Sequence, residues 1–282
     1  MLSGTLPPEW ASINLELLNL GSNSITGTLP PEWSQMQSLQ SLTLSSNQLT
    51  GTLPAVWSIM STLQEVSLDF NMLSGTLPPE WELISLTVVT LLSNNFSGTL
   101  PTAWKALVNL NTMQISNNRL NGTLPRECSS LSRISTLDLS KNSFVGTLHS
   151  SWSNMSLVQS LVLSSNQLSG SLPPEWAALT QLGRLDLSNN QFNGTLPKQW
   201  EEMGGAIPPF SSIPQLSLIL REPHRKATRL AHEQLLDLLK LICAQRRLRN
   251  GTCHRFCVCV TFLFFLLSTC HDDCFLLGLL CV

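Results

Sequence analysis

Residues 39–54 read Leu-Gln-Ser-Leu-Thr-Leu-Ser-Ser-Asn-Gln-Leu-Thr-Gly-Thr-Leu-Pro, and the rest of the chain repeats this stretch. Its closing phrase, Leu-x-Gly-Thr-Leu-Pro, returns with a glycine every 23 or 24 residues. These glycines are Gly4, Gly27, Gly51, Gly75, Gly98, Gly122, Gly146, Gly170 and Gly194. A fixed period in this range is typical of a solenoid, in which each coil packs against its two neighbours.

The repeated frame is L-x-x-L-x-L-x-x-N-x-L-x-G-x-L-P, the pattern of a leucine-rich repeat. It predicts an α/β solenoid over residues 1–203. We expect an arc with a parallel concave sheet and short convex helical turns, followed by a non-repeat C-terminal tail.

The recurring asparagine of the frame marks the end of each predicted strand. Apolar side chains lie five and three residues before it, as Leu42 and Leu44 do before Asn47, and this period of two indicates a strand with one buried face. A buried amide needs hydrogen-bond partners, so we expect the asparagines to form a ladder along the coils. The predicted ladder is Asn23, Asn47, Asn71, Asn94, Asn118, Asn142, Asn166 and Asn190.

All eight tryptophans of the chain occupy one position of the repeat. They are Trp10, Trp33, Trp57, Trp81, Trp104, Trp152, Trp176 and Trp200, and Cys128 takes the remaining place. They follow Leu-Pro-Pro-Glu or a similar phrase, and proline suits the first turn of a helix. We interpret them as a buried indole stack on the convex side rather than a ligand-stacking surface, and Cys128 as a buried thiol rather than a nucleophile.

Positions two, four and six before each asparagine should face outward from the concave sheet. They form a small, hydroxylated and mildly acidic surface, which solenoids of this type offer to partners; a merely solubilising role is the alternative. The candidate binding residues are Ser41, Thr43, Ser45, Glu65, Ser67, Asp69, Thr90, Gln114, Ser116, Asp138, Ser140, Arg184, Asp186 and Ser188. The acidic residues among them are too dispersed to predict a metal site.

Charge and cysteine are unevenly divided between the repeats and the tail. Residues 1–203 hold 7 Lys/Arg against 13 Asp/Glu, and residues 204–282 hold 9 against 5. The repeats lack the basic patch with stacking aromatics that nucleic-acid binding requires, so no nucleic-acid partner is expected. No catalytic constellation and no cofactor motif is apparent, and the predicted function is non-enzymatic.

Five Asn-x-Ser/Thr sequons occur, at Asn95, Asn121, Asn154, Asn193 and Asn250. If the protein is exported, we expect the first four to be glycosylated, and Asn121 and Asn193 share one turn position in their repeats. The N-terminus shows no secretory signal and enters directly in the repeat frame, as though an upstream portion were missing.

The periodicity stops at Met203, where the composition also changes. We predict an irregular linker over 204–227, an amphipathic basic helix over 228–249 and a Cys-rich apolar tail over 250–282. The tail leaves two interpretations open: contact with a membrane, or the product of a reading-frame change in a longer repeat gene. Its cysteine and histidine spacing fits no tetrahedral zinc site well.

The repeat Leu-Pro-Pro-Glu-Trp-Ser-x-Met-x-Ser-Leu-Gln-Ser-Leu-x-Leu-Ser-x-Asn-Gln-Leu-Ser/Thr-Gly, quoted from Leu29 to Gly51, resembles those of trypanosomatid promastigote surface antigens. The resemblance covers residues 1–203. It implies a lipid-anchored or secreted glycoprotein at the cell surface that binds host proteins through its repeats. The L-x-G-x-L-P core is also similar to plant extracellular receptor repeats.

The sequence therefore predicts a non-catalytic protein-interaction module, of the surface-antigen or adhesion type, that binds host or partner proteins through its concave face. Two other interpretations remain. The chain could be a truncated or frame-shifted gene fragment without independent function, or a plant-type receptor-like ectodomain.

Overall fold

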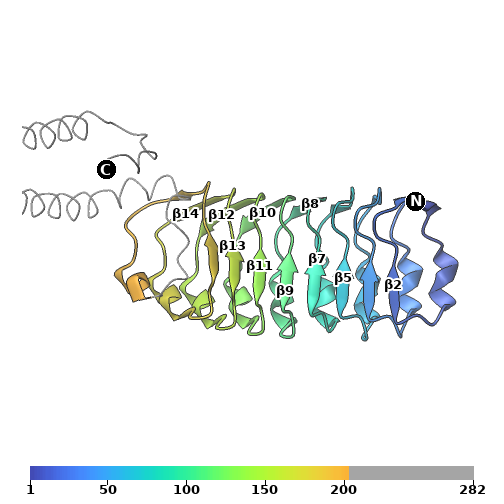
Figure 1. The fold of residues 1–282 in the computed structure, drawn as a ribbon, viewed down its shortest axis with the longest axis horizontal. Helices are drawn as coiled ribbons and strands as arrows, with labels where there is room; N and C mark the ends of the chain where they lie inside the picture. The colour runs from blue at the N-terminus through green and yellow to red at the C-terminus, as the bar shows by residue number, and fades with distance from the viewer. Residues whose placement is uncertain (203–282) are drawn as a thin grey trace, which may run out of the picture. The chain divides into compact units, whose positions relative to one another are not determined.

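The computed structural model describes residues 1–202 as a row of stacked coils, one for each sequence repeat (Figure 1). The predicted linker at 204–227, basic helix at 228–249 and Cys-rich tail at 250–282 lie outside the described residues.

The inner wall of the coils is an eight-stranded parallel sheet with one short strand from each of eight consecutive repeats. Its register is regular, with Ser41 beside Glu65 and Glu65 beside Val88. In chain order its strands are β2 (Leu17–Asn19), β4 (Ser41–Thr43), β5 (Glu65–Ser67), β7 (Val88–Thr90), β9 (Thr112–Gln114), β11 (Thr136–Asp138), β13 (Ser160–Val162) and β15 (Arg184–Asp186). The predicted parallel concave sheet is confirmed.

Side chains alternate across this sheet as the period-two pattern predicts. In β4, Leu42 is completely buried, whereas Ser41 and Thr43 on either side of it are partly exposed. Leu44 continues the buried row beyond the strand. The leucines of successive coils therefore join into one continuous apolar core, while the polar side chains line the opposite face of the sheet.

A second parallel sheet, which was not predicted from the sequence, runs along the coils at the Leu-x-Gly-Thr phrase. Its six strands are β6 (Ser74–Gly75), β8 (Asn95–Gly98), β10 (Arg119–Thr123), β12 (Ser143–Thr147), β14 (Gln167–Gly170) and β16 (Gln191–Phe192). Nearer the N-terminus, β1 (Ser3–Thr5) pairs with β3 (Ser24–Thr26), and Thr28 forms a bridge with Thr50. A central glycine normally weakens a strand, so the phrase had indicated a turn.

That glycine allows one coil to approach the threonine of the coil before it. Gly122 has a φ of 76°, and a Cβ added to it would lie 2.7 Å from the Thr99 methyl carbon. Replacing Gly122 by alanine is expected to lower the free energy of unfolding by about 1–2 kcal/mol through the left-handed backbone alone, and further through this contact. Chemical denaturation measures the change.

Gly183 is the matched control for this substitution. Its φ lies outside the left-handed region, and the nearest atom to an added Cβ is the Gln159 carbonyl oxygen at 3.7 Å. Gly183→Ala should therefore leave the denaturation midpoint near that of the parent chain. Equal midpoints for Gly122→Ala and Gly183→Ala would contradict the close packing of glycine on threonine.

The Pro-Glu-Trp phrase forms a single 3-10 turn in each repeat. In the second repeat the Trp33 N–H donates to the Pro30 carbonyl at 3.2 Å and the Met36 N–H donates to the Trp33 carbonyl at 2.9 Å. Such bonds between residues three apart define a 3-10 helix, which is used in short pieces. The turns are η1 (Pro8–Ser12), η2 (Pro31–Gln35), η3 (Ala55–Ile59), η4 (Pro79–Leu83), η5 (Thr102–Ala106), η6 (Arg126–Ser130), η7 (Ser150–Asn154), η8 (Pro174–Ala178) and η9 (Lys198–Glu202).

The tryptophans stack along the flank that carries these turns. Neighbouring rings are 6.2–6.5 Å apart between centroids and 4–10° from parallel, from Trp10 to Trp104 and again from Trp152 to Trp200. Cys128 occupies the gap between the two stacks. Strands of a parallel sheet lie only about 4.8 Å apart, so this wider spacing places the 3-10 turns on the convex side.

Each indole from Trp33 onward also ties its coil to the preceding one. The Trp57 Nε1–H donates to the Pro30 carbonyl at 3.1 Å. His149 replaces a proline in the seventh repeat, yet its carbonyl accepts the Trp176 Nε1–H in the same way at 3.0 Å. Because the acceptor is a backbone carbonyl, the bond survives a change of side chain at this position.

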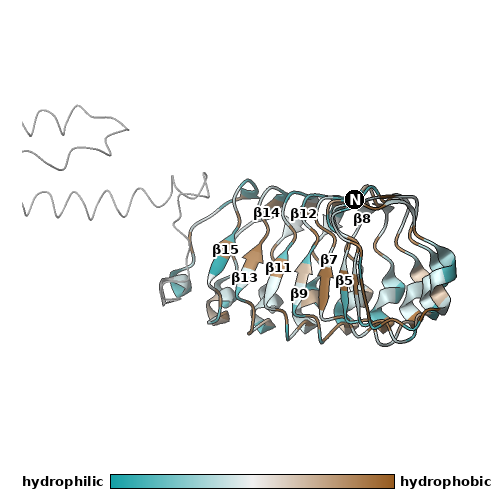
Figure 2. Cartoon of the chain, turned by 45° about the vertical axis from the view of Figure 1, so that its right-hand side comes forward, coloured by the Kyte–Doolittle hydropathy of each residue, from teal (hydrophilic) through white to brown (hydrophobic). Residues whose placement is uncertain are grey.

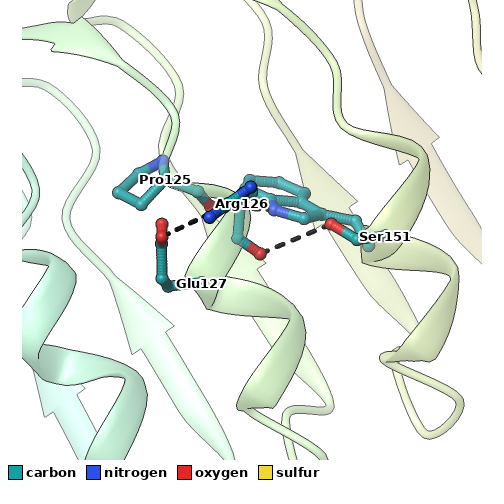
Figure 3. A network of polar contacts seen from close by, with 5 residues as sticks. Pro125, Arg126, Glu127 and Ser151 are labelled. Atoms are coloured by element: carbon teal, nitrogen blue, oxygen red, sulfur yellow. Dashed lines mark hydrogen bonds and ion pairs between the residues drawn. The ribbon is translucent and has the colours of Figure 1, made fainter.

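Figure 3 shows the same junction between the sixth and seventh repeats. The Pro125 carbonyl accepts the Trp152 indole N–H at 3.0 Å, and the next carbonyl, that of Arg126, accepts the Ser151 hydroxyl at 3.4 Å. The Arg126 guanidinium also lies 3.3 Å from the Glu127 carboxylate on the surface. An exposed ion pair of this kind stabilises little, so the junction depends on the indole.

The asparagines bridge coils at the end of each strand of the concave sheet. The Asn47 Nδ2 donates to the carbonyls of Leu20 and Leu44, each at 3.0 Å, and its Oδ1 accepts the Ile25 N–H at 3.0 Å. Leu20 and Ile25 belong to the preceding coil, whereas Leu44 belongs to the same coil as Asn47. One amide therefore satisfies buried backbone groups of two coils.

Candidate binding surface

The candidate residues lie on the strands of the concave sheet, from β4 to β15, and directly after them. They differ in how far they reach solvent. Glu65 and Arg184 are exposed. Thr90, Ser116 and Ser140 are buried, with 8%, 5% and 6% of their surface exposed. The remaining candidates are partly exposed, namely Ser41, Thr43, Ser45, Ser67, Asp69, Gln114, Asp138, Asp186 and Ser188.

The three buried hydroxyls belong to hydrogen-bonded pairs with aspartates. Thr90 donates to the Asp69 carboxylate at 2.7 Å. Ser116 and Ser140 donate to the Asp138 carboxylate at 3.0 and 2.6 Å. These hydroxyls hold strand ends in place, so the free donors and acceptors of the surface come from the other candidate residues.

The aspartates on this face experience different environments. Burial raises the pKa of Asp69 above its ordinary value, although hydrogen bonds from Thr90, the Leu92 N–H and Ser45 oppose that rise. Burial also raises the pKa of Asp186, but hydrogen bonds from Ser188 and Ser164 and the positive charge of Arg184 together outweigh it and bring the pKa below its ordinary value. Charge at Asp69 is therefore disfavoured by folding, whereas charge at Asp186 is favoured.

These opposite shifts predict opposite pH dependence for two variants. A raised native pKa contributes stability at acid pH that is lost as the pH rises through it, and a lowered native pKa contributes stability that is lost as the pH falls through it. Relative to the parent chain, Asp69→Asn should therefore gain stability as the pH rises from acid to neutral, and Asp186→Asn should lose it. Urea denaturation at several pH values measures both trends. If the stability of both variants relative to the parent chain changed in the same direction with pH, the opposite pKa shifts would be contradicted.

Cys128 lies in the tryptophan column, away from the concave face, and is buried. Burial, followed by the nearby Glu127 carboxylate, raises the pKa of its thiol to about 12. A thiol with this pKa is not a nucleophile at neutral pH. Within residues 1–202, no group of three or more His, Cys, Asp or Glu side chains is placed to hold a metal ion.

The burial of Cys128 predicts that it resists alkylation in the folded chain. With iodoacetamide at pH 8, we expect no modification of the Cys128 peptide until denaturant is added, because both exposure and the thiolate are lacking. Peptide mapping by mass spectrometry distinguishes Cys128 from the seven cysteines beyond residue 202. Rapid native alkylation of the Cys128 peptide would contradict its position in the core.

The sequon asparagines within the described residues lie apart from the concave face. Asn121, Asn154 and Asn193 are exposed, and Asn95 is partly exposed in β8. Attachment of a glycan at the exposed positions would leave the concave sheet uncovered. No helix in residues 1–202 has the length and apolar character needed to span a bilayer.

The parallel sheet, the asparagine ladder and the stacked 3-10 turns define a solenoid of short coils with one polar inner face. Two sequence families, both described as leucine-rich repeat, match the chain: one over residues 5–74 and 84–144, the other over 157–179 and 181–203. Together they cover more than half of its length. The chain belongs to the leucine-rich-repeat family.

Solved structures with the same fold include plant receptor ectodomains. A TDR receptor is 32% identical, with a TM-score of 0.70 over 72% of this chain and 36% of that one. The Arabidopsis receptor kinase HAESA ectodomain, in complex with an IDA peptide hormone ligand, is 28% identical, with a TM-score of 0.60 over 72% of this chain and 38% of that one. A plant ice-binding protein is 27% identical, with a TM-score of 0.55 over 70% of this chain and 72% of that one.

The chain thus spans about a third of the length of the receptor structures, 36% and 38% of them. A search of curated proteins finds no match. The comparisons therefore identify the chain as a leucine-rich-repeat protein.

Proposed function

We propose that residues 1–202 form a non-catalytic module that binds a peptide or an extended protein segment along the concave face. The observation that carries this proposal is the eight-stranded sheet, whose outward side chains are mostly polar and, apart from Thr90 and Val162, at least partly exposed. Solenoids use such concave surfaces for binding. The similarity to the HAESA ectodomain, which was solved with a peptide hormone ligand, supports the same use.

The rigidity of the sheet suits this role. Each strand end is fixed by an asparagine amide, and buried side-chain nitrogen and oxygen atoms within the described residues all have hydrogen-bond partners. A surface that is already ordered loses little conformational entropy when it binds. The polar side chains of the concave sheet can then supply hydrogen bonds at regular intervals along an extended ligand.

The experiment that tests this proposal is a selection from a displayed peptide library with the full chain as bait. Selected peptides should bind the parent chain and should lose at least tenfold in affinity to a Ser67→Arg/Gln114→Arg variant, which places bulky charge on two partly exposed positions of the concave sheet. Ser132→Arg/Ser156→Arg adds the same charge at exposed positions in the turns after η6 and η7 and should bind normally. Equal losses in both variants, or no selected peptide, would refute the proposal.

We further propose that the module works outside the cell. The similar HAESA structure is described as an ectodomain, and three exposed sequons lie off the concave face. A surface antigen of the promastigote type and a plant-type receptor ectodomain both fit this location, whereas a frame-shifted gene fragment does not. Treatment of native material with an N-glycosidase tests it: a mobility shift supports export, and an unshifted band together with staining only after permeabilisation refutes it.

A second candidate function, ice binding, is favoured by a regular threonine column on the second sheet. The column consists of Thr5, Thr28, Thr52, Thr76, Thr99, Thr123, Thr147, Ser171 and Thr195, all exposed. Most of these threonines place their methyl group against the glycine of the next coil. The hydroxyls then repeat at the coil spacing and can order water in a fixed pattern, and the similar plant ice-binding protein supports this use.

Thermal hysteresis of a solution of the full chain tests the second candidate. Hysteresis should be present in the parent chain and lost in Thr76→Lys/Thr99→Lys, whose long charged side chains interrupt the threonine column. The Ser67→Arg/Gln114→Arg variant should retain it, because its substitutions lie on the other sheet. A parent chain without hysteresis excludes ice binding and leaves the peptide-binding proposal unaffected.

A further inference from the structure

Phe70 departs from its repeat in both residue type and conformation. It lies directly before a ladder asparagine, with a φ of 54°, and 54% of its surface is exposed. The other repeats place Ser, Asn or Lys in this left-handed position. The left-handed region is uncommon for residues other than glycine, and asparagine is enriched there, so a bulky aromatic side chain is unusual. A strained, exposed residue of this kind calls for a functional explanation.

Two further apolar side chains accompany Phe70 where polar ones are the rule. Met72 is 48% exposed, and the two preceding repeats place Ser24 and Gln48 at its position. Leu92 is partly exposed at a concave position that holds Ser45 in the second repeat. We call Phe70, Met72 and Leu92 the apolar rim.

Backbone contacts bring these residues together at the ends of β5 and β7. The Phe70 N–H donates to the Leu92 carbonyl at 2.8 Å, and the Leu92 N–H donates to the Asp69 carboxylate at 2.8 Å. Only the buried Asn71 separates Phe70 from Met72. In the concave sheet, Figure 2 colours β7, which contains Val88 and Val89, as hydrophobic.

The charged side chains of the repeats up to and including the apolar rim are all acidic, although Glu9, Glu32, Glu80 and Glu82 lie on the 3-10 turns. The first cation at a rim position is Arg119, two coils beyond Met72. Residues 1–104 contain seven Asp/Glu and no Lys, Arg or His. Glu65 is exposed on β5, the strand that leads to Phe70. Asp69, which directly precedes Phe70, is partly exposed. In contrast, residues 105–202 contain seven Lys/Arg and six Asp/Glu, which nearly balance. An unbalanced acidic field attracts cationic partners and raises their rate of association.

We propose that the apolar rim anchors a basic peptide segment that carries large apolar side chains, with Glu65 and the surrounding acidic repeats receiving its cationic groups. This inference rests on the proposed peptide-binding function and names its partner class. The large apolar side chains of the peptide pack against Phe70, Met72 and Leu92, so that the side chains of both partners are desolvated together. A few well-packed anchors of this kind supply most of the affinity of an interface, and the contacts around them exclude water.

Two exposed apolar side chains on the convex turns do not make the same case. Ile59 and Leu83 are exposed on neighbouring convex turns at 53% and 69%. They lie on ordinary 3-10 turns and away from the concave sheet. Scattered exposed apolar residues are normal on protein surfaces, so these two serve as the control for general stickiness.

The test measures binding of short synthetic probe peptides to the full chain by fluorescence anisotropy. One probe alternates Arg and Leu, the second replaces each Leu by Ser, and the third replaces each Arg by Glu. The Arg-Leu probe should bind at least tenfold more tightly than either of the others, and its affinity should fall as salt is raised because the acidic field is screened. Equal binding of the Arg-Leu and Glu-Leu probes would overturn the proposal.

Phe70→Ser/Met72→Gln is the decisive variant. It installs the residues that the second repeat carries as Ser46 and Gln48, so the fold should be retained and the left-handed strain relieved. Binding of the Arg-Leu probe should weaken about tenfold or more, whereas the control Ile59→Gln, which installs the Gln35 of the second repeat, should leave it unchanged. Unchanged binding by Phe70→Ser/Met72→Gln refutes the anchor.

Two outcomes separate this inference from the function on which it rests. If Ser67→Arg/Gln114→Arg abolishes binding of library-selected peptides while Phe70→Ser/Met72→Gln does not, the concave face binds peptides but the anchor proposal fails. If neither variant alters binding, both proposals fail. Sedimentation of the parent chain as a dimer that Phe70→Ser/Met72→Gln converts to a monomer would assign the apolar rim to a second copy of this chain and overturn the peptide assignment.

Discussion

Replacing Trp57 by alanine is expected to lower the free energy of unfolding by about 3–5 kcal/mol, the usual cost of removing a buried aromatic side chain. Trp57 is completely buried and stacks between Trp33 and Trp81, with centroid distances of 6.4 and 6.3 Å. The substitution also leaves the Pro30 carbonyl without its indole partner. Denaturation followed by circular dichroism measures the loss.

Val56→Ala is the control, since Val56 precedes Trp57 in the same 3-10 turn but is 50% exposed. It should change stability by a small fraction of the Trp57 effect, as surface substitutions usually do. If Trp57→Ala unfolded at the same denaturant concentration as Val56→Ala, the indole column would not hold the coils together.

Replacing Asn94 by leucine is expected to lower the free energy of unfolding by about 3 kcal/mol, because each buried backbone group left unpaired costs about 1–3 kcal/mol. The Asn94 Oδ1 accepts the Leu73 N–H at 3.0 Å, and its Nδ2 donates to the carbonyls of Leu68 and Leu91 at 3.0 and 3.2 Å. Leucine has a similar volume but offers neither donor nor acceptor. The change is measured by urea denaturation.

The next residue provides the matched control. Asn95 is partly exposed, and Asn95→Leu removes the same type of side-chain amide one position further along the chain. Its expected cost is well below that of Asn94→Leu, because no hydrogen bond within the described residues depends on its side chain. Similar costs at the two positions would indicate that the ladder hydrogen bonds contribute no net stability.

The repeated positions of the core could be predicted because each one is defined many times over. A buried Leu42, a ladder Asn47 and a column Trp57 recur at fixed intervals, and each has one plausible environment in a stacked coil. The parallel concave sheet and the short convex turns followed directly from these intervals. The 3-10 form of the turns was not predicted, since buried side chains three residues apart, such as Trp33 and Met36, also fit one turn of an α-helix.

The details that escaped prediction depend on contacts between coils. The second sheet is built around glycines such as Gly122, against which the Thr99 methyl group of the preceding coil packs, and this contact between coils cannot be predicted from one repeat alone. Thr90 was predicted to face outward, but its hydroxyl turns to the Asp69 carboxylate and is buried. The left-handed conformation of Phe70 could also not be predicted from its residue type, because the turn shared by all repeats imposes it.

The measurement that tests the stacked coils most directly is quenching of tryptophan fluorescence in the folded full chain. All eight tryptophans lie within residues 10–200, and those from Trp33 onward are buried, so no signal comes from the rest of the chain. We predict blue-shifted emission and weak quenching by iodide, with both properties lost on unfolding. Emission at the wavelength of free indole, with strong quenching before denaturant is added, would contradict the account.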